Sequence, residues 1–121
     1  MEELAPHSPA AQAVYAYVRT VPPGRVVTYG QVAEMVETVA LTPRQVGHIM
    51  NNAPEDVPWQ RVVGAGGNLP IGKRGTPLMM RQRQLLEQEG VPFRADGRID
   101  MGACQLRADD PLGGIFGAAE E

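Results

Sequence analysis

The first pattern along the chain is a run of apolar residues at helical spacing. Ser8 followed by Pro9 combines an N-cap with a proline that suits the first turn of a helix. The apolar positions then repeat with the helical period, at Val14, Tyr15 and Val18. The pattern predicts a helix over residues 9–20, which the turn-forming residues 22–24 end.

Two further helix starts follow, and both have the spacing of a capping box. Thr28 precedes Gln31, and Thr42 precedes Gln45 with a proline between them. An apolar stripe follows each start, made first of Val32, Ala33 and Val36 and then of Val46, Ile49 and Met50. Two short helices separated by residues 38–41 predict a helix-turn-helix, in which Ala33 and Gly47 are small enough for a close crossing. The second helix of such a pair usually meets DNA.

The second half of the chain has one more clear helix signal. Residues 64–68 are rich in glycine and predict a tight turn, at the tip of a hairpin or wing. Thr76 and Pro77 repeat the cap-and-proline pattern and predict a helix that stops at Gly90. Residues 91–107 offer no firm pattern, and residues 108–121 are expected to form a loosely held acidic tail. We therefore expect a mostly α, winged helix-turn-helix-like domain over residues 1–107.

Composition restricts the class of protein. A chain of 121 residues with 43% hydrophobic content can build one core without disulfides. No apolar run approaches the roughly 20 residues of a spanning helix, and the N-terminus lacks the features of a signal peptide, so we expect a cytoplasmic protein without membrane contact. Cys104 is the single cysteine, and with His7 and His48 it forms no zinc-ligand spacing. Neither a metal nor a cofactor is expected.

Charge is unevenly distributed along the chain. The net charge is −3, but residues 8–107 hold all 11 basic residues and only 8 of the 14 acidic ones. All but one of the basic residues are arginines, whose planar guanidinium suits contacts with phosphates and bases. This distribution permits nucleic-acid binding without demonstrating it.

The run from Pro58 to Gly64 carries the most informative motif. It resembles the active-site stretch of the O6-alkylguanine-DNA alkyltransferases, in which Pro, Cys, His, Arg and Val follow one another and the cysteine accepts the alkyl group. Here Trp59 stands in the cysteine position and Gln60 in the histidine position. An indole cannot replace a thiolate, which is both nucleophile and alkyl acceptor. The resemblance therefore implies binding without alkyl transfer, and the protein is not expected to be an enzyme.

The resemblance extends from about Val14 to Gly90. Blocks in the same order include residues 22–30, the start of the third helix at Arg44, and the segment from Leu85 to Gly90. With tryptophan in the cysteine position, the chain is most similar to the alkyltransferase-like proteins, which are non-enzymatic sensors of alkylated guanine that lead lesions into nucleotide excision repair. The DNA- or lesion-binding residues that the resemblance implies are Tyr29, Gln31, Arg44, Gly47, Asn51, Asn52, Pro58, Trp59, Gln60, Val62, Lys73 and Arg74.

The resemblance also implies a role for several of these residues. Arg44 would enter the base stack in place of an extruded nucleotide, although a surface arginine in a first helical turn is the alternative. Tyr29 would clash with the 3′ phosphate and help rotate the nucleotide out, unless it is a core tyrosine. Trp59 would line the lesion pocket or, alternatively, fill the core, and base stacking on an aromatic contributes about 1–3 kcal/mol. Arg74, or Lys73 in its place, would close over the base. The alternative is that Arg74 is a solvated arginine in a loop.

Neighbouring residues are expected to have supporting roles. Arg61 should tie the motif to nearby carbonyl groups. Glu89 corresponds to the last member of the enzymes' proton relay and should here order the end of the helix. Cys104 lies outside the motif and is expected to be an inert, partly buried thiol.

The leading functional hypothesis is a monomeric damage-recognition protein. It would bind duplex DNA from the minor groove, flip O6-alkylguanine into a pocket and leave it unrepaired, with double-stranded DNA and nucleotide excision repair proteins as partners. One alternative is a winged helix-turn-helix transcription regulator that reads the major groove. Another is an active transferase that uses Cys104. The preferred alkyl size and the role of the acidic tail stay open.

Overall fold

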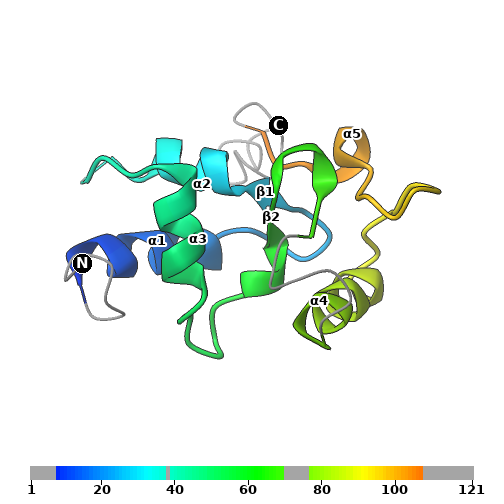
Figure 1. Cartoon of the computed structure of the whole chain (residues 1–121), viewed down its shortest axis with the longest axis horizontal. Helices are drawn as coiled ribbons and strands as arrows, with labels where there is room; N and C mark the ends of the chain where they lie inside the picture. The colour runs from blue at the N-terminus through cyan, green and yellow to red at the C-terminus, as the bar shows by residue number, and fades with distance from the viewer. Residues whose placement is uncertain (1–7, 38, 70–76, 108–121) are drawn as a thin grey trace, which may run out of the picture.

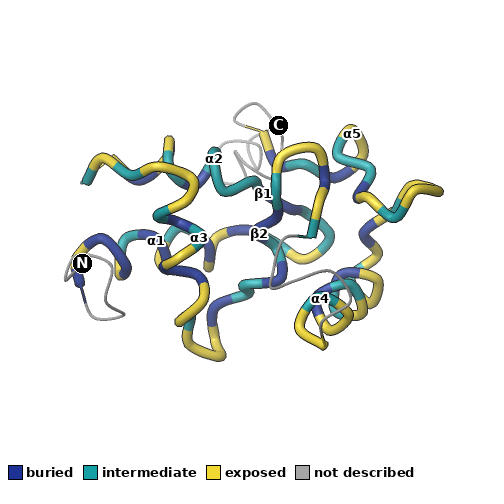
Figure 2. Tube along the Cα trace, in the orientation of Figure 1, coloured by how far each residue is buried: buried dark blue, intermediate teal, exposed yellow. Residues whose placement is uncertain are grey.

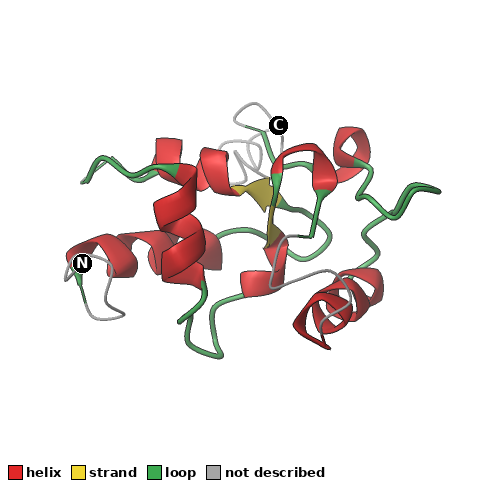
Figure 3. Ribbon diagram, viewed as in Figure 1, coloured by secondary structure: helices red, strands yellow, loops and turns green. Residues whose placement is uncertain are grey.

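Helices dominate the described part of the chain. The computed structural model describes residues 8–37, 39–69 and 77–107. Its elements, with η for a 3-10 helix, are α1 (Pro9–Arg19), β1 (Val27–Thr28), α2 (Tyr29–Met35), α3 (Pro43–Met50), η2 (Trp59–Arg61), β2 (Val62–Val63), η3 (Ala65–Gly67), α4 (Pro77–Gln88) and α5 (Met101–Cys104). The two short strands lie in the middle, with α1 and α3 toward one end of the molecule and α4 toward the other (Figure 1, Figure 3).

The first helix forms as its caps predict. The Ser8 hydroxyl accepts a hydrogen bond from the backbone N–H of Ala11 at 3.1 Å, and Pro9 occupies the first helical position. Thr20 caps the other end, so the predicted helix over residues 9–20 is confirmed with its last residue as the cap. Val14 and Val18 are fully buried.

The predicted helix-turn-helix is confirmed. In α2 the Thr28 hydroxyl accepts from the backbone N–H of Gln31 at 3.0 Å, and the Gln31 side chain accepts from the N–H of Thr28 at 2.9 Å. Thr42 and Gln45 repeat this reciprocal pair at the start of α3. These bonds satisfy N–H groups that would otherwise lack partners at a helix start. Each helix start is therefore determined within four residues of sequence.

The small sheet joins two segments that lie far apart in the chain. Val27 pairs with Val62 and Thr28 with Val63, and the two strands are parallel. The predicted tight turn at residues 64–68 is confirmed, since the Gly64 N–H donates to the Asn68 carbonyl at 2.8 Å. Residues 70–76, which follow this turn, lie outside the described residues, so its role as the tip of a hairpin or wing stays a prediction.

The region that showed no pattern in the sequence is ordered by long-range contacts. Leu106 donates its N–H to the carbonyl of Val26 at 2.8 Å, and Val26 donates to the carbonyl of Cys104 at 3.1 Å. The N–H of Ile99 donates to the Gly67 carbonyl at 3.0 Å. Gly67 has φ +91°, and a Cβ there would lie 2.5 Å from the Ile99 carbonyl oxygen, so this approach requires glycine. The predicted cap Thr76 and the tail 108–121 lie outside the described residues.

Buried residues gather into two clusters, one on each side of the sheet (Figure 2). Val27 and Val62 belong to the cluster that α1, α2 and α3 cover. Val26, which directly precedes β1, and Val63 of β2 belong to the cluster that includes Leu86 of α4. Successive side chains of a strand point to opposite faces, so the two strands join both cores. Within the described residues, no helix is long and apolar enough to cross a membrane.

Candidate nucleic-acid interface

One face of α3 is open to solvent. Arg44, His48, Asn51 and Asn52 are exposed on or just after this helix, while Val46 and Ile49 on its other face are fully buried. The Tyr15 hydroxyl donates to the Ile49 carbonyl at 2.9 Å and ties α3 to α1. The helix therefore presents a rigid polar face, with a length and position that suit insertion into a DNA groove.

Arg44 lies in the first turn of this helix. It is exposed and forms no ion pair with any other described residue. The N-terminal end of a helix carries partial positive charge, so a guanidinium there gains from an anionic or aromatic partner outside the protein. The position leaves the side chain available to DNA.

Tyr29 and Gly47 are in contact where α2 and α3 cross. A Cβ on Gly47 would lie 3.8 Å from the Tyr29 ring, an ordinary van der Waals distance, so the ring packs close to the α3 backbone without requiring a glycine there. Tyr29 is half-buried, and burial raises the pKa of its phenol to about 12. The phenol therefore stays uncharged well above neutral pH.

The side chain of Gln31 is engaged inside the protein. Besides capping α2, its Nε2 donates to the Leu106 carbonyl at 2.6 Å, and its Oε1 accepts from Gln105 Nε2 at 2.8 Å. Gln31 thus joins α2 to the C-terminal segment. Val62 is also inside the protein, because it is 1% exposed and belongs to the core.

Trp59 lines a small cavity next to the end of α3. The cavity has a volume of about 190 Å³ and is lined by Met50, Asn51, Ala53, Trp59 and Leu78. Trp59 is half-buried and packs on the core from the 3-10 helix η2, which follows Pro58. Four of the five lining side chains are apolar and none is charged. The cavity therefore suits a flat, neutral group that can pack against an indole.

A partly buried network of hydrogen bonds supports the residues next to Trp59. Glu89 accepts from Gln60 Nε2 at 2.7 Å and from Arg61 Nε and Nη2, both at 3.0 Å. The N–H of Gly24 also donates to it at 3.4 Å. Arg61 Nη1 donates to the Val21 carbonyl at 2.7 Å, so the expected tie between Arg61 and a nearby carbonyl is present. Glu89 does more than order a helix end, because its carboxylate holds Gln60, Arg61 and the turn at Gly24 together.

Gln82 anchors the same segment from the other side. It is fully buried, and its Nε2 donates to the carbonyls of Gln60 and Val62, both at 3.1 Å. Its Oε1 has no partner among the described residues. The sequence contained a signal for this residue, because Gln82 lies four residues before Leu86 and shares its buried helix face.

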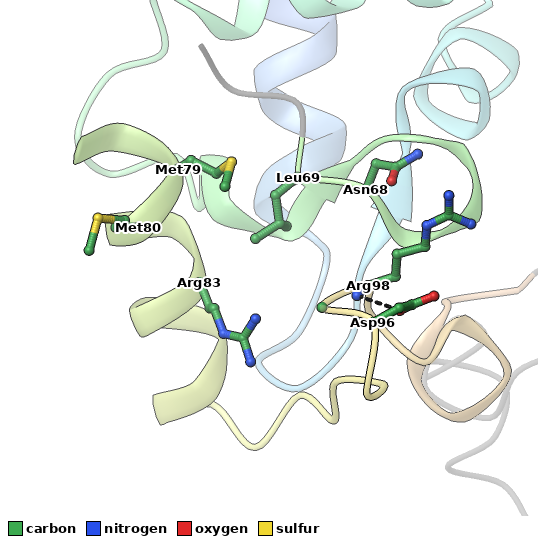
Figure 4. A pocket seen from close by; sticks show the side chains of 8 residues that line it. Asn68, Leu69, Met79, Met80, Arg83, Asp96 and Arg98 are labelled. Carbon is green, nitrogen blue, oxygen red and sulfur yellow. Dashed lines mark hydrogen bonds between the residues drawn. The ribbon is translucent and has the colours of Figure 1, made fainter. Parts of the chain in front are cut away.

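Two larger cavities lie outside the Trp59 cavity. One of about 670 Å³ is also lined by Trp59, but its lining is largely polar and includes Gln60, Arg61 and Arg81 together with the ion-paired Arg19 and Asp56. The other, of about 800 Å³, lies between α4 and the turn at residues 96–98 (Figure 4). It is lined by Asn68, Leu69, Met79, Met80, Arg83, Asp96, Gly97 and Arg98. This cavity is larger than the Trp59 cavity but shares no residue with the run from Pro58 to Gly64. The volume of a cavity therefore does not by itself identify the functional site.

Lys73 and Arg74 lie outside the described residues, so their expected contact with a bound base stays a prediction. Met50, Ala53 and Leu78 line the Trp59 cavity and were not among the expected site residues. Among the described residues, no three His, Cys, Asp or Glu side chains gather as a metal site would require.

Cys104 is poorly placed to act as a nucleophile. It is 2% exposed, and its thiol donates to the Asp100 carbonyl at 3.4 Å. Burial and the nearby Asp100 carboxylate raise the pKa of the Cys104 thiol, although Arg25 opposes them. A raised pKa lowers the fraction of reactive thiolate.

Comparisons with known proteins agree with this geometry. Residues 9–91 match the family described as 6-O-methylguanine DNA methyltransferase, DNA binding domain. A DNA base-flipping protein of Escherichia coli (strain K12) is 38% identical over 92 residues, covering 74% of this chain and 68% of that protein. Alkyltransferase-like protein 1 of Schizosaccharomyces pombe is 42% identical over 81 residues, covering 64% of this chain and 72% of that protein.

Solved structures show the same fold. The structure of S. pombe Atl1 in complex with damaged DNA containing O6-carboxymethylguanine aligns with a TM-score of 0.67 and 30% identity, over 88% of this chain and 97% of that one. Mycobacterium tuberculosis OGT in complex with DNA aligns with a TM-score of 0.58 and 33% identity, over 68% and 50% of the two chains. The predicted fold class is confirmed. The chain therefore belongs to the family of the 6-O-methylguanine DNA methyltransferase DNA-binding domain and, with tryptophan in the cysteine position, it is an alkyltransferase-like protein.

Proposed function

We propose that this protein recognises O6-alkylguanine in duplex DNA and binds it without removing the alkyl group. The observation that carries the proposal is the position of Trp59, which stands where the resemblance places a nucleophile and lines an uncharged cavity at the end of α3. Relatives named for base flipping and a similar structure bound to damaged DNA support it.

In the proposed complex, α3 enters the minor groove of the duplex. Arg44 takes the space of the extruded nucleotide, Tyr29 meets the adjacent phosphate, and the lesion enters the Trp59 cavity. Extrusion costs a few kcal/mol, and less for a damaged base that pairs badly. Stacking on an aromatic ring returns about 1–3 kcal/mol. Weak pairing and the apolar cavity together favour the lesion over unmodified guanine.

The surroundings of Trp59 also support a role without catalysis. An alkyl acceptor requires a nucleophile and a base that can remove its proton. Gln60 supplies an uncharged amide, and the Glu89 carboxylate already accepts hydrogen bonds from Gln60 and Arg61. The bound lesion would stay intact and be passed to nucleotide excision repair. We further propose that residues 1–107 form the binding domain of a monomeric cytoplasmic protein.

The test is a binding titration with matched duplexes. Two duplexes that differ only in one O6-methylguanine are titrated with the protein, and the modified duplex should bind more tightly. Arg44→Ala should weaken binding to it and abolish the fluorescence change of an analogue that reports an unstacked base. Arg94→Ala is the matched control, because Arg94 is also an exposed arginine but belongs to the segment after α4, the helix that lies toward the opposite end of the molecule from α3 (Figure 1). Equal affinity for both duplexes would rule out lesion recognition.

A winged helix-turn-helix transcription regulator is the alternative from another class. Such a protein would select a defined sequence from random undamaged DNA, because base contacts in the major groove carry its specificity. The proposed function predicts no enriched sequence in that selection. A single enriched motif would favour the regulator.

A further inference from the structure

Gln82 is a buried polar side chain that uses its donors and not its acceptor. It lies on α4 and shares one buried face of that helix with Leu86. An amide nitrogen has two hydrogens to donate, and Nε2 of Gln82 donates to the carbonyls of Gln60 and Val62, each at 3.1 Å. Its Oε1 is buried without a partner among the described residues. Both donated bonds leave α4 and end on another segment.

This arrangement is unfavourable for a position in the core. A buried amide oxygen that has given up water and gained no donor destabilises the folded state. A methionine would fill nearly the same space beside Leu86 without that cost. Core packing alone therefore does not explain a glutamine at position 82, so the explanation has to come from the segment that accepts its two hydrogen bonds.

That segment includes η2, which is a single 3-10 turn. The N–H of Arg61 donates to the Pro58 carbonyl at 3.0 Å. The N–H of Val62 donates to the Trp59 carbonyl, and Pro58 gives the turn no side-chain cap. Hydrogen bonds in a 3-10 turn have poorer geometry than those in an α-helix, and one turn contains few of them. The orientation of Trp59 therefore depends on restraints from elsewhere in the protein.

The region of α4 supplies two such restraints, and they act on different atoms. Glu89 accepts hydrogen bonds from the side chains of Gln60 and Arg61. Gln82 instead holds the backbone carbonyls of residues 60 and 62, on either side of Arg61. A bond to the backbone restricts the path of the chain itself. Gln82 thereby fixes the point at which η2 becomes β2, and with it the direction in which the Trp59 side chain leaves the backbone.

We propose that Gln82 is a positioning residue that holds the Trp59 ring in the orientation used for lesion recognition. The proposal rests on the proposed function and adds a residue that is fully buried and so contacts neither DNA nor lesion. An aromatic ring stabilises a bound base only when its face meets the face of the base. A ring that is free to tilt gains less from stacking. Gln82 thus acts on discrimination through Trp59 while it adds little to stability.

The experiment compares two substitutions on the same buried face of α4 in the full-length protein. Gln82→Met removes both donated bonds and keeps an unbranched side chain of similar length. Leu86→Val is the matched control, because Leu86 is equally buried one turn further along and has no polar atom to restrain η2. Wild type and both variants are titrated with duplexes that differ only in one O6-methylguanine, and their melting temperatures are measured.

The two variants should separate discrimination from stability. Gln82→Met should lower the ratio of the two affinities by about tenfold, which corresponds to losing part of the stacking on Trp59. Its melting temperature should fall by no more than that of Leu86→Val, for which about 5 °C is expected. Leu86→Val should keep the affinity ratio of wild type. Gln82→Leu, a second variant without donors, should behave as Gln82→Met does.

A second measurement follows Trp59 without DNA. Trp59 is the single tryptophan, so time-resolved fluorescence anisotropy reports the motion of its ring alone. Gln82→Met should show a fast component of ring motion that is absent from wild type and from Leu86→Val. An unchanged anisotropy decay in Gln82→Met would refute the positioning role, whether or not the protein recognises lesions.

The titrations distinguish the failure of this inference from the failure of the proposed function. If wild type binds both duplexes equally, the proposed function fails and the role of Gln82 in recognition falls with it. If wild type discriminates and Gln82→Met discriminates equally well, only the role of Gln82 is overturned. An equal loss of discrimination in Leu86→Val would show that Gln82 acts through general stability, which also overturns the proposal.

Discussion

The ion pair between Arg61 and Glu89 offers the sharpest test of how the site is held together. Glu89→Gln keeps the shape of the side chain but removes its charge and one of its two acceptor oxygens. Arg61, whose side chain is 14% exposed, then keeps the Val21 carbonyl and one uncharged amide oxygen in place of the carboxylate, so its charge has no anionic partner. Removing one partner of a buried pair costs about 3–5 kcal/mol, and we take about 3 kcal/mol because the pair is not fully buried.

The protein also contains an exposed control pair with the same closest approach, although Arg83 donates one side-chain hydrogen bond to Glu87 where Arg61 donates two to Glu89. Arg83 and Glu87 approach to 3.0 Å, as Arg61 and Glu89 do, but their side chains are 42% and 50% exposed. Water screens such a pair, and an exposed pair one helical turn apart contributes about 0.3–0.5 kcal/mol. Glu87→Gln should therefore change stability several-fold less than Glu89→Gln, although the two substitutions are chemically identical.

Urea unfolding measures both effects, with the single tryptophan Trp59 as the fluorescent reporter. A loss of about 3 kcal/mol should lower the melting temperature by more than about 10 °C in a domain of this size. The double variant Arg61→Met, Glu89→Met should recover part of the lost stability, because it leaves no unpaired charge in the protein interior. Equal losses in Glu89→Gln and Glu87→Gln would refute the reasoning, because burial would then have no influence on the pair.

Two further predictions concern titration and reactivity. Since burial raises the pKa of Tyr29 to about 12, its contribution to stability is present below about pH 10 and is lost as the pH rises through about 12. Burial also raises the pKa values of Tyr15 and Tyr17, so alkaline titration followed by phenolate absorbance should show a late component that Tyr29→Phe reduces, and identical curves would contradict this. The buried Cys104 thiol, with its raised pKa, should react with a thiol reagent much more slowly in the folded protein than in urea. Mass spectrometry after incubation with alkylated DNA should likewise detect no added alkyl mass, and an alkylated Cys104 would show that it is an acceptor.

The amino-acid sequence by itself determined the local elements of this protein. Thr28 with Gln31, and Thr42 with Gln45, identify the starts of α2 and α3, because each capping box closes within four residues. Trp59 in the cysteine position identified the branch of the family, because that argument depends on the chemistry of one side chain. Neither conclusion required knowledge of distant contacts.

Only the tertiary structure decided how the site is assembled. The parallel pairing of Val27 with Val62 and the contact between Gly67 and Ile99 join segments far apart in the chain, so no short window of sequence contains them. The position of Leu78 in the lining of the Trp59 cavity also depends on packing between segments that are far apart in the chain. Hydrogen bonds within one turn are set by neighbouring residues, whereas the partners of a buried carboxylate such as Glu89 depend on how the two cores bring distant segments together.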